Sequence, residues 1–506
     1  MSINELDTTT SNGSAIGFDN DKYIALQAEH IKERIGQFGG KLYLEFGGKL
    51  FDDYHASRVL PGFEPDSKIR MLRSLAADVE VVIAINANHI EKNKVRGDLG
   101  ITYDEDVLRL MDIFKGLGLY VGSVVITHFA EQQKAKAFRS RLDSMGITSY
   151  LHYPIAGYPH DIDLIVSDDG YGKNDYVETS RPLVVVTAPG PGSGKMATCL
   201  SQLYHENRRG IKAGYAKYET FPIWNLPLQH PVNIAYEAAT ADLGDDNIID
   251  PFHLEAYGQT TVNYNRDVEI FPVLKSMLER ILGESPYNSP TDMGVNMAGM
   301  AIVDDEACRE ASKLEILRRY FHAAEAFKRS GVGGREVHKI EMLMKKAQIS
   351  PEMHPARAVA LAKEESTGGP AGAMRLPDGS IVTGKTGNLM GAASALLMNA
   401  LKGLAGVPNK LLVIEDEVLE PICKLKKEHL NSHNSRLHSD ETMLALAVSS
   451  RNNEMAAKLI DAVGGLRGCD AFFSVIVSPT DETFYRTLGI NVCCEPRYEQ
   501  SCYYHG

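Results

Sequence analysis

The chain has 506 residues, too many for one hydrophobic core, so two to four domains are expected. Its net charge of −13 argues against general nucleic-acid binding, which requires clustered cations. The seven cysteines form no CxxC pair, and neither a signal peptide nor an apolar run of membrane-spanning length is present. We therefore expect a cytoplasmic protein without a nucleic-acid or membrane partner.

The first half of the chain alternates apolar strands with helices. Residues 1–16 are small and polar and are expected to be disordered. Strands are expected at 41–46, 79–86, 121–127, 149–153, 162–167 and 183–186. Helices are expected at 21–35, 104–117 and 130–145. This alternation predicts a parallel α/β sheet, in which ligands bind at the carboxyl ends of the strands.

Polar residues gather at several of these expected strand ends. They form the clusters Asn86–His89, Thr127–His128, Asp168–Asp169 and Gly190–Lys195. A further glycine turn at 47–49 (Gly-Gly-Lys) could contact an anion, but a plain turn is the simpler interpretation.

One stretch has the order strand, glycine-rich loop and helix. Residues 188–195 read Ala-Pro-Gly-Pro-Gly-Ser-Gly-Lys, and a helix-forming segment follows from Met196 to His205. Glycines let successive N–H groups converge on an anion, and the helix N-terminus adds partial positive charge. The sequence therefore predicts a P-loop-like phosphate site formed by Gly190, Gly192, Ser193, Gly194, Lys195, Met196 and Thr198.

The loop departs from the G-x-x-x-x-G-K-[ST] pattern at two positions. Pro189 stands where the first glycine belongs and has no N–H to donate. Met196 stands where a hydroxyl would bind magnesium, and a thioether is a poor ligand for that hard cation. We expect a phosphorylated ligand more than ordinary Mg-ATP hydrolysis. The alternative is a tight strand-to-helix turn whose glycines only permit close packing.

The catalytic candidates lie outside this loop. The polar, aromatic-rich region 213–267 shows little periodicity and is expected to face substrate, with a solvated or subunit-contact surface as the alternative. Asp168 or Asp267 is a candidate metal or base carboxylate. Arg266 is a candidate for stabilising developing charge in phosphoryl transfer. No dedicated set of protein metal ligands is recognised.

Composition and spacing divide the chain into four segments. A disordered N-terminus (1–16) precedes an α/β domain with the phosphate site (17–275), a helical linking region (276–345) and a C-terminal α/β domain (346–506). In the last domain, helices are expected at 351–365, 389–404 and 440–463, a hairpin at 372–376 and 380–383, and strands at 410–414 and 472–477.

This C-terminal domain contains a misleading motif. Residues 379–386 match the P-loop pattern letter for letter, but 380–383 read as a strand, so the glycines do not share one loop. The order helix, hairpin, glycine turn and helix resembles the opening of the cytidine deaminase fold. The zinc ligands of those enzymes are absent, so we expect neither zinc nor deaminase chemistry.

Seven long stretches resemble one bacterial family. They are KLYLEFGGKL, GDLGITYD, LVVVTAPGPGSGKMATCLSQLYHE, ETFPIWNLPL, HPVNIAYEAATADL, NYNRDVEIFPVL and SPTDMGVNM. The chain is identified as a member of domain-of-unknown-function family 1846, also called UPF family 0371. The resemblance implies a multidomain α/β fold, a cytoplasmic protein and a homo-oligomer, but no activity. A peptidase is not supported, because H-E-x-x-H and G-x-S-x-G are both absent.

Two hypotheses of function follow. The first is an enzyme, a phosphotransferase or hydrolase, that binds a nucleotide or phosphorylated metabolite, with or without Mg²⁺. The second is a non-catalytic homo-oligomer that binds an anion for structure or regulation. Met196 favours the second, and the density of Asp, His, Lys and Asn at the strand ends favours the first.

Overall fold

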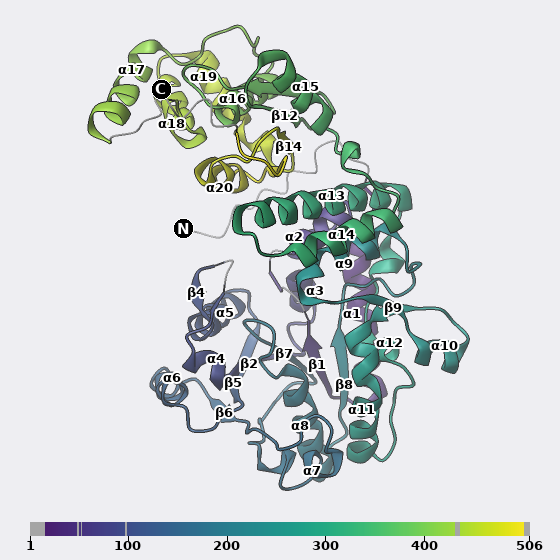
Figure 1. Ribbon diagram of the computed structural model, residues 1–506. Coiled ribbons are helices and arrows are strands. Elements are labelled where there is room, and N and C mark those ends of the chain that lie inside the picture. Colours follow the sequence, from purple (N-terminus) through teal and green to yellow (C-terminus); the bar gives the residue numbers. More distant parts are fainter. Residues whose placement is uncertain (1–15, 48–49, 52, 97–98, 431–435, 500–506) are drawn as a thin grey trace. The chain divides into compact units, whose positions relative to one another are not determined.

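The computed structural model describes residues 16–47, 50–51, 53–96, 99–430 and 436–499 (Figure 1). Apart from Ile16 and Gly47, the expectations for 1–16 and 47–49 lie outside this range. The described chain forms two compact units. The sheet unit consists of 16–237 and 245–308, and the C-terminal unit of 238–244 and 309–499.

The sheet unit is built on seven strands in the order β11-β8-β1-β7-β2-β5-β6. All neighbouring pairs are parallel, which confirms the predicted parallel α/β sheet. The strands are β1 (Leu42–Phe46), β2 (Val79–Asn86), β5 (Tyr120–Thr127), β6 (Ser149–Leu151), β7 (Leu183–Thr187), β8 (Gly214–Tyr218) and β11 (Gly294–Val295). Four of them match predicted strands closely, and β7 takes the central place.

Helices cover both faces of this sheet, which explains why most of its strand residues are apolar. One face packs against α1 (Asn20–Gln37), α3 (Ser67–Ser74), α5 (Tyr103–Gly116) and α6 (Gln133–Ser144). The other packs against α7 (Ile162–Ile165), α8 (Lys195–Arg208) and α11 (Asn265–Leu282). Successive side chains of a strand point to opposite faces, so each strand supplies both cores.

Shorter elements complete the sheet unit. They are α2 (Tyr54–Val59), α4 (Ala87–Glu91), β3 (Val95–Arg96), β4 (Ile101–Thr102), α9 (Pro231–Ala239), β9 (Asn247–Ile249), α10 (Pro251–Tyr257), β10 (Val262–Tyr264) and α12 (Pro290–Met293). The region 213–267, which lacks clear periodicity in the sequence, thus contains β8, two helices and an antiparallel β9–β10 pair.

One prediction in this unit is wrong. Residues 162–167 were expected as a strand, but 162–165 form the helix α7. Periodicity cannot separate a strand from a helix in so short an apolar run. The Asp161 side chain accepts a hydrogen bond from the Leu164 amide and caps the helix. Asp168 therefore follows a helix and not a strand.

The C-terminal unit contains a four-stranded sheet in the order β13-β12-β14-β15, with only the last pair parallel. Its strands are β12 (Ala371–Arg375), β13 (Ile381–Lys385), β14 (Asp470–Phe473) and β15 (Asn491–Cys494). The predicted hairpin is confirmed, and residues 381–385 are a strand, so the rejection of the second P-loop pattern holds. The cytidine deaminase topology stays a prediction.

The helices after the sheet unit are α13 (Asp305–Ser330), α14 (Gly334–Lys346), α15 (Arg357–Thr367), α16 (Ala392–Ala405), α17 (Asp416–Lys424), α18 (Ser439–Ser449), α19 (Glu454–Asp461) and α20 (Pro479–Thr487). The strand expected at 410–414 is wrong, since these residues are irregular. The single helix expected at 440–463 is two, because Asn453 caps α19. Among the described helices, none is long and apolar enough to cross a membrane.

Candidate functional site

A loop of residues 188–194 joins the central strand β7 to α8, as the sequence predicts. Two of its glycines have left-handed backbone, with φ of +73° at Gly192 and +83° at Gly194. A Cβ at Gly194 would lie 3.0–3.1 Å from the Thr127 side chain, and one at Gly190 would collide with the Tyr103 hydroxyl. The turn and its close packing both require glycine here.

Two side chains from neighbouring strand ends hold the carbonyl groups of this loop. The Asn86 Nδ2 donates to the Gly192 carbonyl at 3.0 Å, and the Thr127 Oγ1 donates to the Ser193 carbonyl at 2.8 Å. In a trans peptide the C=O and N–H groups point in opposite directions. The next two amides, those of Ser193 and Gly194, are therefore directed away from the supporting strands.

Six successive amides in this segment lack a protein acceptor among the described residues. Within the described part of the chain, the N–H groups of residues 192–197 donate no hydrogen bond to protein atoms. The first helical bond of α8 runs from the Thr198 amide to the Gly194 carbonyl at 2.9 Å. Open amides at the positive end of a 14-residue helix form a ready-made anion site.

The side chains of the loop have divided roles. The Ser193 hydroxyl donates to the Gly190 carbonyl at 2.9 Å and so stabilises the turn. The Thr198 hydroxyl is fully buried and has no hydrogen-bond partner among the described residues. Lys195 is half-buried at the start of α8, while Met196 presents no oxygen at the position of the usual magnesium ligand.

Two histidines from the expected strand-end clusters accompany the loop. A Cβ at Gly192 would lie 3.5 Å from the His89 ring. The His89 Nδ1 is buried without a hydrogen-bond partner in the described residues. Burial lowers the pKa of His89, and the neighbouring Lys94 and His128 lower it further. Burial also lowers the pKa of His128. Both rings are therefore neutral at pH 7, and a bound anion nearby would favour their protonation.

A second polar cluster lies at the end of β8. The Lys217 ammonium pairs with the Glu219 carboxylate at 2.8 Å and also with Asp267, in the first turn of α11. The Lys217, Glu219 and Asp267 side chains are only 22%, 11% and 22% exposed. Glu45 of β1 is in register with Lys217, and its carboxylate accepts a hydrogen bond from Tyr215 at 2.8 Å.

Burial and charge act against each other in this cluster. Burial raises the pKa of Glu219 to about 7, and although Lys217 opposes this, the charge of Asp267 adds to it. Burial lowers the pKa of Lys217, but attraction to Asp267 and Glu219 outweighs it and leaves that pKa raised. Lys217 thus stays an ammonium, while Glu219 exchanges a proton near neutral pH.

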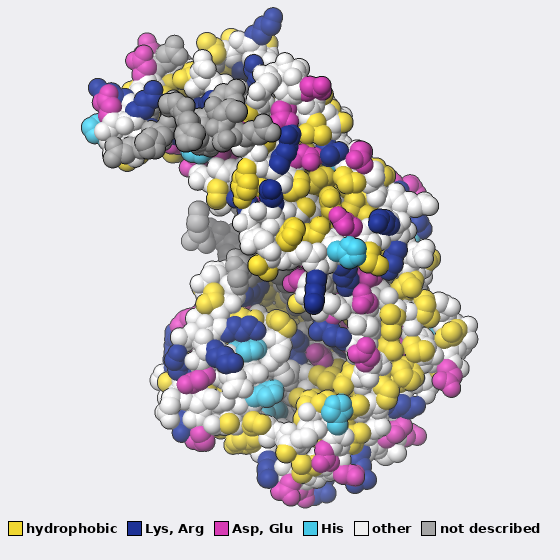
Figure 2. Space-filling model, in the orientation of Figure 1, with side chains coloured by type: hydrophobic (Ala, Val, Ile, Leu, Met, Phe, Trp, Pro, Cys, Tyr) yellow, Lys and Arg dark blue, Asp and Glu magenta, His cyan; other side chains and the backbone are white. Residues whose placement is uncertain are grey.

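The loop and this cluster occupy the same part of the sheet. Strands β7 and β8 flank β1, so their ends lie about 10 Å apart at the usual spacing of parallel strands. Cys199, one turn into α8, is near enough to both groups for their charges to act on it. Burial raises the pKa of Cys199, the Glu45 carboxylate raises it further, and the Lys195 ammonium opposes the rise. Figure 2 shows a hollow between α5 and β8, with histidine, lysine and arginine side chains around it.

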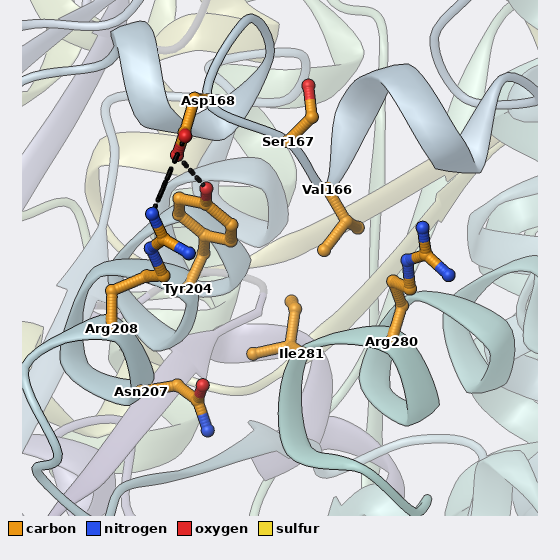
Figure 3. A pocket seen from close by; sticks show the side chains of 8 residues that line it. All are labelled: Val166, Ser167, Asp168, Tyr204, Asn207, Arg208, Arg280 and Ile281. Atoms are coloured by element: carbon orange, nitrogen blue, oxygen red, sulfur yellow. Dashed lines mark hydrogen bonds and ion pairs between the residues drawn. The ribbon is translucent and has the colours of Figure 1, made fainter.

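Asp168 does not belong to this site. It accepts a hydrogen bond from the Tyr204 hydroxyl at 2.6 Å and pairs with Arg208 at 3.4 Å (Figure 3). Tyr204 comes nine positions after Lys195 in α8, which corresponds to about 14 Å along the helix at a rise of about 1.5 Å per residue. Asp168 instead lines a shallow cavity of about 350 Å³ with Val166, Ser167, Tyr204, Asn207, Arg208, Arg280 and Ile281.

The other two catalytic candidates lie nearer. Asp267 is part of the cluster around Lys217, whereas Arg266 is mostly exposed and pairs with Asp245 at 2.5 Å. The sequence reasoning assigned no role to Lys217 or Glu219. The available signal was the pair of Lys217 and Glu219 at the end of β8, but β8 is short and was not recognised as a strand.

Comparison with known proteins shows the family of this chain. Two consecutive family models match the chain: "Domain of unknown function DUF1846, N-terminal" over residues 16–348 and "Domain of unknown function DUF1846, C-terminal" over 352–504. The chain belongs to the DUF1846 family. A UPF0371 protein of Streptococcus pneumoniae serotype 19F (strain G54) is 59% identical over 482 residues, 95% of this chain and 98% of that protein.

A UPF0371 protein of Streptococcus thermophilus (strain CNRZ 1066) has the same identity and coverage. Neither the DUF1846 descriptions nor the names of these relatives state an activity or a ligand. The function must therefore be argued from the site.

Proposed function

We propose that this protein is an enzyme acting on a small phosphorylated molecule, whose phosphate lies on the amides of residues 192–197. The row of open amides at the start of α8 carries the proposal. Their peptide planes are held from behind by Asn86 and Thr127, so no reorganisation is needed when an anion arrives. Lys195 adds a full positive charge at the same helix end.

Two features argue for catalysis rather than anion storage. The cluster of Lys217, Glu219 and Asp267 is largely buried at the end of β8, two strands from β7, and buried ionisable clusters of this kind are candidates for functional sites. The site also lies at the carboxyl ends of parallel strands, where α/β proteins hold their ligands.

Phosphoryl transfer from a nucleotide, or its hydrolysis, is the second candidate. Lys195 occupies the place of the P-loop lysine, which favours it. Met196 weighs against it, because magnesium usually takes a hydroxyl ligand at that position. A metal-independent site for a phosphorylated metabolite fits both residues better.

Calorimetric titration with inorganic phosphate, pyrophosphate and ATP, each with and without Mg²⁺, tests the proposal. A charge-assisted hydrogen bond contributes about 1.5–3 kcal/mol, so Lys195→Ala should bind phosphate roughly ten- to a hundredfold more weakly. Lys115→Ala removes an exposed lysine from the end of α5 and serves as the matched control. Equal affinity of wild type and Lys195→Ala would contradict the phosphate site.

Met196→Ser distinguishes the two candidates. In a magnesium-dependent nucleotide site, the added hydroxyl should retain or improve ATP binding only when Mg²⁺ is present. In a metal-independent phosphate site, the same variant should change affinity less than about threefold with or without the cation, because the amides do the binding.

A further inference from the structure

Glu219 and Asp267 approach Lys217 from different elements. Glu219 follows β8, and Asp267 lies in the first turn of α11. Both carboxyl groups pair with the same ammonium, so they lie close to each other. When two carboxyl groups are held this close, a proton on one of them relieves their repulsion.

The local charge gives the same result. One ammonium, that of Lys217, faces Glu219, Asp267 and the carboxylate of Glu45, which is in register with it on β1. Repulsion between buried carboxylates favours the uptake of a proton, and burial raises the pKa of Glu219 in particular. Lys217 holds the two carboxyl groups in place without supplying that proton.

The backbone leaves Glu219 room to act. A Cβ at Gly294 of β11 would lie 3.2 Å from the Glu219 Oε2, so the glycine keeps that side of the carboxyl group uncrowded. Tyr264 borders the cluster: burial raises its pKa, Tyr236 raises it further, and Glu219 and Asp267 add to the shift. A ligand extending from the loop over β1 would meet a proton carrier beside an aromatic ring.

We propose that the Glu219–Asp267 pair is the general acid–base group of this enzyme, acting on a phosphorylated substrate that carries a hydroxyl within reach of Glu219 when its phosphate lies on the amides of residues 192–197. A sugar phosphate has this chemistry. The inference rests on the proposed phosphate site and adds the reacting group to it.

The proposed step is a proton transfer. The ionised Glu219 carboxylate accepts the proton of the substrate hydroxyl; the O–H bond breaks, the substrate oxygen keeps the electron pair, and a carboxylic O–H bond forms. In the reverse direction the protonated Glu219 returns the proton to an oxygen of the substrate. Lys217 keeps its proton throughout and stabilises the ionised form of the pair.

Sulfate is a suitable probe, because it resembles phosphate but does not itself titrate near neutral pH. Calorimetry in two buffers of different ionisation enthalpy measures the protons taken up on binding. The two negative charges of sulfate about 10 Å away, at an effective dielectric constant of about 20 and screened over a Debye length of about 10 Å, raise the pKa of Glu219 by roughly one pH unit. At pH 7.5 wild type should then take up about half a proton more than Glu219→Gln.

Glu269→Gln is the matched control, because this exposed residue lies on α11 only two positions from Asp267. Any protons that His89 and His128 take up are the same in Glu269→Gln and in wild type. Proton uptake by Glu269→Gln should therefore equal that of wild type. Sulfate affinity should rise about threefold in Glu219→Gln, because an ionised carboxylate no longer repels the anion, and should change little in Glu269→Gln. Equal proton uptake by wild type and Glu219→Gln overturns the inference, while absence of sulfate binding in wild type contradicts the phosphate site itself.

A measurement on wild type alone covers the case in which Glu219→Gln does not fold. Infrared titration of protein labelled with ¹³C-carboxyl glutamate should show a protonated glutamate band that disappears with a midpoint near pH 7. Exposed glutamates ionise near pH 4.3 and do not interfere. If no glutamate band titrates above pH 6, the pair does not carry the proton and the proposal fails.

Discussion

At the scale of single residues, burial rather than sequence position decides which ionisable groups can act. Asp168 is 78% exposed and lies at the far end of α8, whereas Glu219 is 11% exposed beside an ammonium. In the sequence, Asp168 follows an expected strand, whereas Glu219 lies in the region 213–267 without clear periodicity. Only Glu219 is buried among other charged groups, and this burial raises its pKa.

A single histidine also makes the C-terminal unit sensitive to pH. His438 pairs with Asp481 at 3.1 Å, and Asp481 further accepts hydrogen bonds from Ser439 and Ser478. The hydrogen bond that His438 donates to the Asp481 carboxylate raises the pKa of His438. Burial alone would raise the pKa of Asp481. The hydrogen bonds from His438, Ser478 and Ser439 outweigh the effect of burial and lower this pKa to about 2.

The signs of these shifts set the pH window. Because the pKa of His438 is raised in the folded state, its contribution is complete below about pH 6.5 and is lost as pH rises above that value. Asp481 contributes above about pH 4, and this is lost as pH falls toward 2. His438→Gln should therefore destabilise the unit by about 0.5–1 kcal/mol at pH 5.5 and by less at pH 8.5, as measured by urea unfolding. A difference that grows with pH would contradict this assignment.

At the scale of elements, the connection from β7 to α8 is the best-determined part of the protein. Its glycines are placed where the backbone is left-handed or where another residue comes close, so local sequence and tertiary contacts agree. The apolar run 162–167 shows the opposite case. Its composition suits a strand, but the cap at Asp161 makes α7 a helix.

Gly194→Ala tests the loop against a glycine of another kind. At Gly194 the φ of +83° and the contact with Thr127 both oppose a side chain, so we expect a loss of about 1–3 kcal/mol and much weaker phosphate binding. A Cβ added at Gly36, within α1, would meet no atom within 4 Å, and Gly36→Ala should stabilise by about 0.5–1 kcal/mol. Thermal unfolding with and without phosphate measures both; equal stability changes would show that the loop conformation is not strained.

At the scale of the whole molecule, the chain forms two units, each with its own core. Leu200 is buried in the core between the sheet and α8, and Leu446 in the core of the C-terminal unit. The phosphate site and the carboxyl pair both belong to the sheet unit. The domain boundaries expected at 275 and 345 and the homo-oligomer stay predictions.

The two cores offer a matched pair of variants. Leu200→Ala and Leu446→Ala each remove a fully buried side chain and should cost about 2–5 kcal/mol. Because a ligand stabilises only the folded state that binds it, phosphate should raise the melting temperature of the transition affected by Leu200→Ala. Differential scanning calorimetry should show that Leu446→Ala leaves phosphate affinity unchanged. A loss of affinity in that variant would place part of the site in the C-terminal unit.

The sequence by itself determined the features that depend on neighbours along the chain. We could predict β2, β5, β7 and the glycine loop, because strand composition and turn chemistry are local properties. The DUF1846 membership could also be predicted, because long stretches of the sequence resemble that family. Only the tertiary structure decided that β8 lies beside β1, which brings Lys217 to Glu45, and that the first turn of α11 places Asp267 next to Lys217. No local pattern records which strands become neighbours, because that choice depends on burying the whole sheet between two layers of helices.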